Sequence, residues 1–112
     1  MAKRIIAYVA HRFGGAPELN AQRVRMLART LAFSGTLPIA PQIYLPQFIE
    51  EATERDLALR MCLALVALSD EVRVYGEVSP GMRLEIAEAR RLGIPVVDGM
   101  SGAPLPKGEP PR

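Results

Sequence analysis

The chain has 112 residues, 49% of them apolar and 23% charged, and this balance is typical of one globular domain with a single core. Its net charge is +2, the basic residues are spread along the chain, and it has three Phe, three Tyr and no Trp. A nucleic-acid-binding protein would be expected to show a basic stripe or an aromatic stacking platform. We therefore expect no nucleic-acid partner.

The cysteine count and the short apolar runs indicate in which cellular compartment the protein is expected. Cys62 is the lone cysteine, which excludes an internal disulfide and a CxxC metal site, and its apolar helical surroundings favour a buried structural thiol. Residues 1–10 have too short an apolar run for a signal peptide, and Cys62–Leu68 is too short to span a bilayer. We expect a cytoplasmic protein with no membrane partner, no metal and no cofactor.

Residues 4–10 form a near-continuous apolar run, which predicts a buried parallel strand. The loop that follows carries Gly14 and Gly15, which would let backbone approach a ligand, and His11 and Arg12, which would bring polar or positive groups to the same rim. The pattern is not GxGxxG, so a plain turn and a phosphate or sugar loop both stay open. His11 fits a structural or surface role as well as a catalytic one.

The next segment predicts a crossover helix over 17–33, in which Asn20 either caps locally or faces the first loop. A short strand over 37–40 contains Pro38, which indicates a sheet edge, where a missing N–H is tolerated. Residues 41–48 hold prolines, glutamines and aromatics and predict a stiff loop. That loop is either a well-packed connection or one wall of a pocket.

The predicted helix over 50–68 is charged in its first half and apolar in its second. We expect the segment 62–68 to be buried, and we expect a homo-oligomer, because association covers apolar surface that a small core cannot. A fourth strand follows over 94–97.

The most informative stretch begins with a strand over 72–75. Ser79 then fits a helix N-cap and Pro80 fits the first helical position. The free N–H groups at Gly81 and Met82 would face whatever lies beyond the end of the strand. A strand, a tight loop and a helix in this order form a ligand-binding geometry.

Glu85 is the candidate catalytic residue of this helix. Met82, Ile86 and Ala89 form a buried stripe, and Glu85 falls against that stripe with no cation at i±3 or i±4. A carboxylate there is either an edge glutamate paired with an arginine from elsewhere or a functional group.

The alternation of strands and helices predicts an α/β fold, a Rossmann-like three-layer sandwich with a four- to five-stranded, mostly parallel sheet and helices on both faces. The domain covers residues 1–100, and the Pro/Gly-rich tail 101–112 is expected to be extended or disordered. Ligands of such sheets bind at the carboxyl ends of the strands. The loops expected to meet there are 10–16, 40–48, 76–81 and 98–102.

A set of short motifs spanning residues 4–98 carries a family resemblance. These motifs are Tyr8-Val9-Ala10, Pro38-Ile39-Ala40-Pro41 with Tyr44, Pro46-Gln47-Phe48, Glu54-Arg55, Ser69-Asp70-Glu71, Ser79-x-Gly81-Met82-x-x-Glu85-Ile86-x-x-Ala89 and Gly93-Ile94-Pro95-Val96. Together they make the chain similar to the small uncharacterised proteins grouped beside the nucleoside 2-deoxyribosyltransferases.

The resemblance implies an N-glycosyl enzyme, a transferase or a hydrolase, acting on a nucleoside or nucleotide. The residue matching the family's nucleophile is Glu85, whose carboxylate would take the sugar carbon in a covalent intermediate. The expected substrate-binding residues are Tyr8, His11, Arg12, Gly14, Gly15, Tyr44, Ser79, Gly81 and Met82.

Two departures from the family pattern lead to an alternative interpretation. The chain has Ser79 where several of those enzymes have an aspartate, and it offers no counterpart for their other catalytic aspartate. A non-catalytic protein that binds or sequesters a nucleotide on the same fold is therefore the second interpretation, and a scaffold role is the third.

Overall fold

Strands and helices alternate along the chain as the apolar pattern predicts. The computed structural model describes residues 4–106. Its elements, in order, are β1 (Ile6–Ala10), α1 (Pro17–Phe33), β2 (Leu37–Ile39), α2 (Pro41–Tyr44), the 3-10 helix η1 (Leu45–Gln47), α3 (Arg55–Ala67), β3 (Glu71–Val74), α4 (Pro80–Arg91) and β4 (Val96–Asp98).

The four strands form one fully parallel sheet in the order β2-β1-β3-β4. Pro38 lies on β2 at the sheet edge, as predicted, where its lack of an N–H leaves no central ladder bond unmade. The chain leaves β1 toward β2 on one side and later returns to β3 on the other. The direction of the topology therefore switches between β1 and β3.

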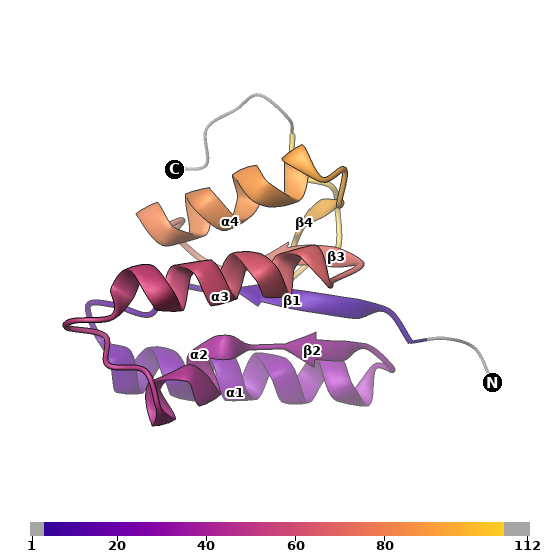
Figure 1. Cartoon of the computed structure of the whole chain (residues 1–112). Coiled ribbons are helices and arrows are strands. Elements are labelled where there is room, and N and C mark those ends of the chain that lie inside the picture. The colour runs from indigo at the N-terminus through magenta and orange to yellow at the C-terminus, as the bar shows by residue number, and fades with distance from the viewer. Residues whose placement is uncertain (1–3, 107–112) are drawn as a thin grey trace.

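Helices cover both faces of this sheet, and the predicted three-layer α/β fold is confirmed. Side chains of α3 and α4, including Val66 and Ile86, pack on the face of the sheet that carries Tyr8. Val24 of α1 packs with Val9 on the other face. Figure 1 shows α3 and α4 lying along each other, with α1 beside β2 at the opposite end of the sheet.

The strands predicted over 72–75 and 94–97 are shifted to Glu71–Val74 and Val96–Asp98, and two predictions between residues 41 and 68 are wrong. The segment 41–48 is not a loop but contains α2 and η1, because Pro41 and Pro46 each stand in a first turn, where a missing N–H costs nothing. The helix expected from residue 50 begins at Arg55 instead. In the preceding turn, the Glu54 carboxylate accepts a hydrogen bond from the Glu50 N–H at 2.8 Å.

The predicted burial of 62–68 is also wrong within a single chain. Val66 alone in this segment is fully buried, while Leu68 is 69% exposed. One stripe of α3 faces the core, and the remaining side chains point outward. Within residues 4–106, no helix has the length and apolarity needed to cross a membrane.

The first part of the C-terminal tail runs along the edge of the sheet. Pro104 forms an antiparallel bridge with Val97, and the Leu105 N–H donates to the Val96 carbonyl at 3.0 Å. The expectation for the rest of the tail, 107–112, falls outside the described residues.

Candidate functional site

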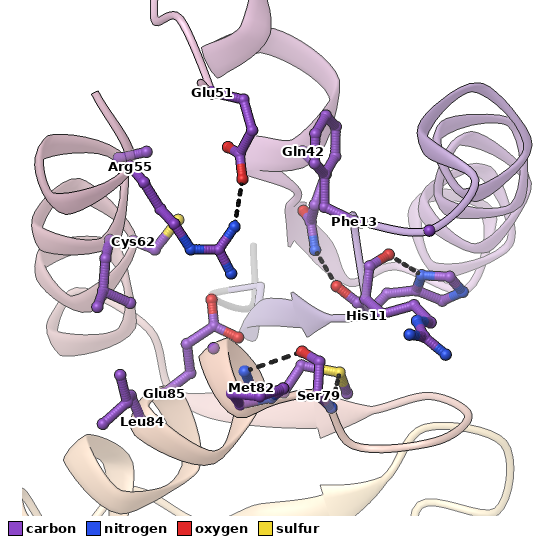
Figure 2. A pocket seen from close by; sticks show the side chains of 17 residues that line it. His11, Phe13, Gln42, Glu51, Arg55, Cys62, Ser79, Met82, Leu84 and Glu85 are labelled. Carbon is purple, nitrogen blue, oxygen red and sulfur yellow. Dashed lines mark hydrogen bonds and ion pairs between the residues drawn. The ribbon is translucent and has the colours of Figure 1, made fainter. Parts of the chain in front are cut away.

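A cavity of about 430 Å³ opens beside the carboxyl ends of β1 and β3, at the switch in topology. It lies where open α/β sheets bind ligands, and its size is within the range of small-molecule sites. The lining comes from the loop 11–15, from α4 and its N-cap between residues 79 and 85, from the start of α3 and from Gln42 of α2. Figure 2 shows the Arg55 and Glu85 side chains pointing into this space from α3 and α4.

Glu85 is the buried carboxylate of this cavity. Its side chain is 7% exposed, and its Oε2 atom accepts a hydrogen bond from the Tyr8 hydroxyl. Burial raises the pKa of Glu85 to about 7, and the Tyr8 hydrogen bond acts in the opposite direction. No arginine within residues 4–106 forms an ion pair with Glu85, so it is not the paired edge glutamate of the simpler interpretation.

Two further titratable side chains, Tyr8 and Cys62, lie near this carboxylate. Tyr8 is fully buried, and its pKa is raised well above the ordinary value by burial and by the charge of Glu85. The Tyr8 hydroxyl therefore stays protonated and acts as the hydrogen-bond donor to Glu85. Cys62 lines the cavity instead of being fully buried, and burial raises the pKa of its thiol to about 11. A thiol in this state is a poor nucleophile.

The start of α4 has the predicted cap. Ser79 Oγ accepts the Met82 N–H at 3.3 Å, and the Ser79 N–H points to Met82 Sδ at 3.4 Å. The prediction that the Met82 N–H is free is therefore wrong, because the cap uses it. A side chain at Gly81 would meet nothing within 4 Å, so the backbone there is open toward the cavity.

The loop after β1 is held by Asn20, which faces this loop and does not cap its own helix. Its Nδ2 donates to the carbonyls of Phe13 and Gly14 at 3.0 and 3.1 Å, and its side chain is buried. Gly15 has φ +89°, a conformation that favours glycine. Both glycines of the loop line the cavity, as expected.

His11 and Arg12 also line the cavity. His11 Nδ1 lies 2.7 Å from the Arg12 carbonyl oxygen and donates a hydrogen bond to it, since a carbonyl oxygen can only accept. The Arg12 guanidinium lies 3.7 Å from Glu77 in a pair whose side chains are 48% and 87% exposed. Such a pair contributes little to stability, so Arg12 is available to a ligand.

Gln42 is a lining residue that the sequence did not single out. Its Nε2 donates to the Val9 and His11 carbonyls at 2.9 and 3.2 Å, which ties α2 to the end of β1. Tyr44 of the same segment does not line the cavity; it is 43% exposed and stacks against Phe48 with ring centroids 6.3 Å apart.

Arg55 and Glu51 were likewise missed. Their side chains form an ion pair at 2.6 Å, and both line the cavity. Figure 2 shows the Arg55 guanidinium reaching from α3 into the space between Glu51 and Glu85. The motif Glu54-Arg55 was the one sequence signal for this residue. A helix starting at residue 50 would have placed Arg55 in its second turn, whereas Arg55 is the first residue of α3.

The loop 98–102 does not join the site, contrary to expectation. It folds back on the edge strand β4, with the Gly102 N–H bonded to the Asp98 carbonyl at 2.7 Å, and its Gly99 N–H is bonded to the Val74 carbonyl of β3 at 2.8 Å. Met100 lines a separate hollow beside α1. Among residues 4–106, no group of three or more His, Cys, Asp or Glu side chains could hold a metal ion.

Two solved structures are similar in fold to this chain. The first is a 2-deoxyribosyltransferase from Bacillus psychrosaccharolyticus, described as a biocatalyst for the synthesis of antiviral and antitumoral nucleosides; it has a TM-score of 0.59 and 18% identity, over 82% of this chain and 69% of that one. The second is a conserved protein from Enterococcus faecalis V583, with a TM-score of 0.62 and 18% identity over 86% of this chain. This chain spans 63% of the length of the Enterococcus protein.

Among curated proteins, none matches this sequence significantly. At 18% identity, these likenesses show a shared fold, which the first structure has as a 2-deoxyribosyltransferase, and they do not show the chemistry of this chain. The family profile described as "Domain of unknown function (DUF7768)" matches residues 5–98, a range that includes all the strands and helices described above. The chain therefore belongs to the DUF7768 family.

Proposed function

We propose that this chain is an N-glycosyl enzyme, a transferase or a hydrolase, that acts on a nucleoside or nucleotide with Glu85 as the nucleophile. The observation that carries the proposal is the position of Glu85: a carboxylate that is 7% exposed, faces a cavity of about 430 Å³ and accepts a hydrogen bond from Tyr8. The fold shared with a 2-deoxyribosyltransferase supports a nucleoside as the ligand class.

The chemistry follows from the surroundings of Glu85. Cleavage of a glycosidic bond passes through an oxocarbenium-like transition state, which an adjacent carboxylate stabilises and then captures at C1′. With a pKa of about 7, part of the Glu85 population is ionised at neutral pH. Partial burial strengthens its attraction for the developing positive charge, and the Tyr8 hydroxyl fixes the orientation of the carboxylate.

The remaining lining residues would hold the sugar and any phosphate. Gly14, Gly15 and Gly81 expose backbone to the cavity, and Arg12 and His11 stand at its rim. Ser79 caps α4 beside them, and Met82 packs beneath. Water or a second base would then release the sugar from Glu85, which distinguishes a hydrolase from a transferase.

A nucleotide-binding protein without catalysis is the second candidate. The observation in its favour is that Glu85 is the one buried carboxylate among the described lining residues, while Glu51 is paired with Arg55. A glycosidase usually uses two carboxyl groups, one of them as an acid.

A screen of nucleosides and nucleoside monophosphates tests both candidates. Thermal shift reports binding, and chromatography of the free base reports cleavage. Base release with at least one compound supports the enzyme. Binding without release selects the second candidate, and neither binding nor release with any compound contradicts both.

A further inference from the structure

The cavity contains a cation whose role the proposed function has not used. Arg55 stands at the start of α3, and its guanidinium reaches into the same space as the Glu85 carboxylate. Its ion pair with Glu51 joins side chains that are 69% and 47% exposed, so the pair adds little to folding stability. One hydrogen bond to Glu51 leaves further N–H donors of the guanidinium free for a ligand.

The proposed cleavage leaves an electron pair on the departing base. An enzyme either protonates that base with an acid or stabilises it as an anion. Among the described lining residues, Glu85 is the one buried carboxyl group, and the Cys62 thiol, whose pKa is raised to about 11, is a weak acid. Glu51 accepts a hydrogen bond from Arg55, the Tyr8 hydroxyl donates to Glu85, and the His11 Nδ1 proton points to the Arg12 carbonyl oxygen. The cavity thus presents a fixed cation where a second carboxylic acid would be expected.

We propose that Arg55 stabilises the negative charge of the departing base, and that the preferred substrates carry an oxo-base such as hypoxanthine, uracil or thymine. This inference rests on the proposed function. In these bases the glycosidic nitrogen is conjugated with a carbonyl, so the leaving electron pair is shared with an oxygen that accepts hydrogen bonds from a guanidinium. Adenine has no such oxygen.

The step needs no reactant other than the nucleoside and water. An oxygen of the Glu85 carboxylate bonds to C1′ as the C1′–N bond breaks, and the bonding pair moves onto the base nitrogen and its conjugated carbonyl. Arg55 holds that charge until the base takes a proton from water. A second water then hydrolyses the glycosyl ester and restores the Glu85 carboxylate.

The test compares base release from 2′-deoxyinosine and 2′-deoxyadenosine by the unmodified protein, Arg55→Gln and Arg60→Gln. Arg60 lies on the same helix, is exposed and does not line the cavity, so its variant is the matched control. We expect the unmodified protein to prefer deoxyinosine. Arg55→Gln should lower kcat for deoxyinosine about 100-fold, because the charge develops only in the transition state. Deoxyadenosine cleavage should change little.

Two results would overturn the inference: a preference for deoxyadenosine, or an equal loss on both nucleosides in Arg55→Gln. If the unmodified protein cleaves neither nucleoside nor any other compound of the screen, the enzyme proposal fails separately. Calorimetric titration with free hypoxanthine and adenine then decides the role of Arg55. Weaker binding of hypoxanthine alone in Arg55→Gln supports Arg55 as the donor to the base carbonyl, and unchanged binding of both bases excludes it.

Discussion

The Tyr8 hydroxyl donates a hydrogen bond to Oε2 of Glu85, which joins the middle of the first strand to a helix residue 77 positions later in the sequence. Both groups are buried, and they meet beside the switch point between β1 and β3. A buried carboxylate without a cation is costly, so a donor in this position keeps its charged form accessible. Burial raises the pKa of Glu85 and this contact lowers it, and the result is a pKa of about 7.

Tyr8→Phe removes that donor without changing the shape of the core. We expect it to destabilise the fold by about 1–3 kcal/mol at pH 8, where the Glu85 charge would lose its described hydrogen-bond partner. The loss should be smaller at pH 5, where Glu85 is protonated. Urea unfolding at both pH values measures the difference. Tyr44→Phe, at an exposed position outside the cavity, serves as the control, and an equal loss from Tyr8→Phe at both pH values would contradict this role.

The raised pKa of Glu85 also predicts how stability depends on pH. Its pKa is about 7 in the folded state against an ordinary 4.5, so between these values the folded chain binds a proton that the unfolded chain lacks. Stability from this group is therefore greatest below pH 4.5 and falls as the pH rises to about 7, by about 3 kcal/mol in all. Glu85→Gln should abolish this loss, because glutamine does not ionise.

Urea unfolding between pH 4.5 and 8 checks this expectation on Glu85→Gln and on Glu88→Gln. Glu88 lies one turn further along α4, pairs with Arg91 and does not line the cavity, so its variant should keep the pH dependence of the unmodified protein. A Glu85→Gln protein with the same pH dependence would show that Glu85 titrates as an ordinary surface carboxylate.

Features set by local chemistry were predictable from the sequence. The helix over 17–33 was predicted with its observed bounds because Pro17 opens it and Gly35 follows its end. The Ser79 cap and Pro80 were recognised for the same reason. The parallel sheet followed from the alternation of apolar strands with helices.

Features that depend on tertiary contacts were not predictable. The hydrogen bond from Tyr8 to Glu85 could not be predicted, because only the fold brings β1 under α4. Arg55 was missed because the direction in which its side chain points depends on where α3 begins. The turn closed by the Glu54 carboxylate places the first residue of α3 at Arg55 instead of residue 50. The loop 98–102 was misplaced because its backbone bonds to its own sheet edge, a pairing that no local signal announces.

Asn20→Ala tests how the loop after β1 is held. Two hydrogen bonds from one buried side chain to the Phe13 and Gly14 carbonyls would be lost, and we expect a cost of about 1–2 kcal/mol. Ligand binding should weaken as well, because the same loop lines the cavity. Urea unfolding and thermal shift measure both effects. Gln22→Ala, exposed on the same helix, is the matched variant, and an Asn20→Ala protein that behaved like it would exclude a supporting role.

The apolar side chains exposed on α3, at its C-cap and on α4 predict a homo-oligomer. Leu57, Leu68 and Leu84 are 38%, 69% and 49% exposed in the single chain. Association would remove this surface from water. Light scattering should show a dimer or larger assembly at micromolar concentration, and Leu68→Glu with Leu84→Glu should shift it toward monomer. A monomeric unmodified protein would contradict this prediction.

The role of Glu85 as nucleophile is tested most directly by trapping the glycosyl intermediate. A nucleoside that the protein cleaves is mixed with it at pH 8, the reaction is stopped with acid, and the peptide containing Glu85 is weighed by mass spectrometry. We predict that this peptide carries the added mass of the sugar, and that Glu85→Gln forms no adduct and releases base at least about 1,000-fold more slowly, while Glu88→Gln matches the unmodified protein. Base release by Glu85→Gln within tenfold of the unmodified rate, with no adduct on either protein, would contradict the proposed nucleophile.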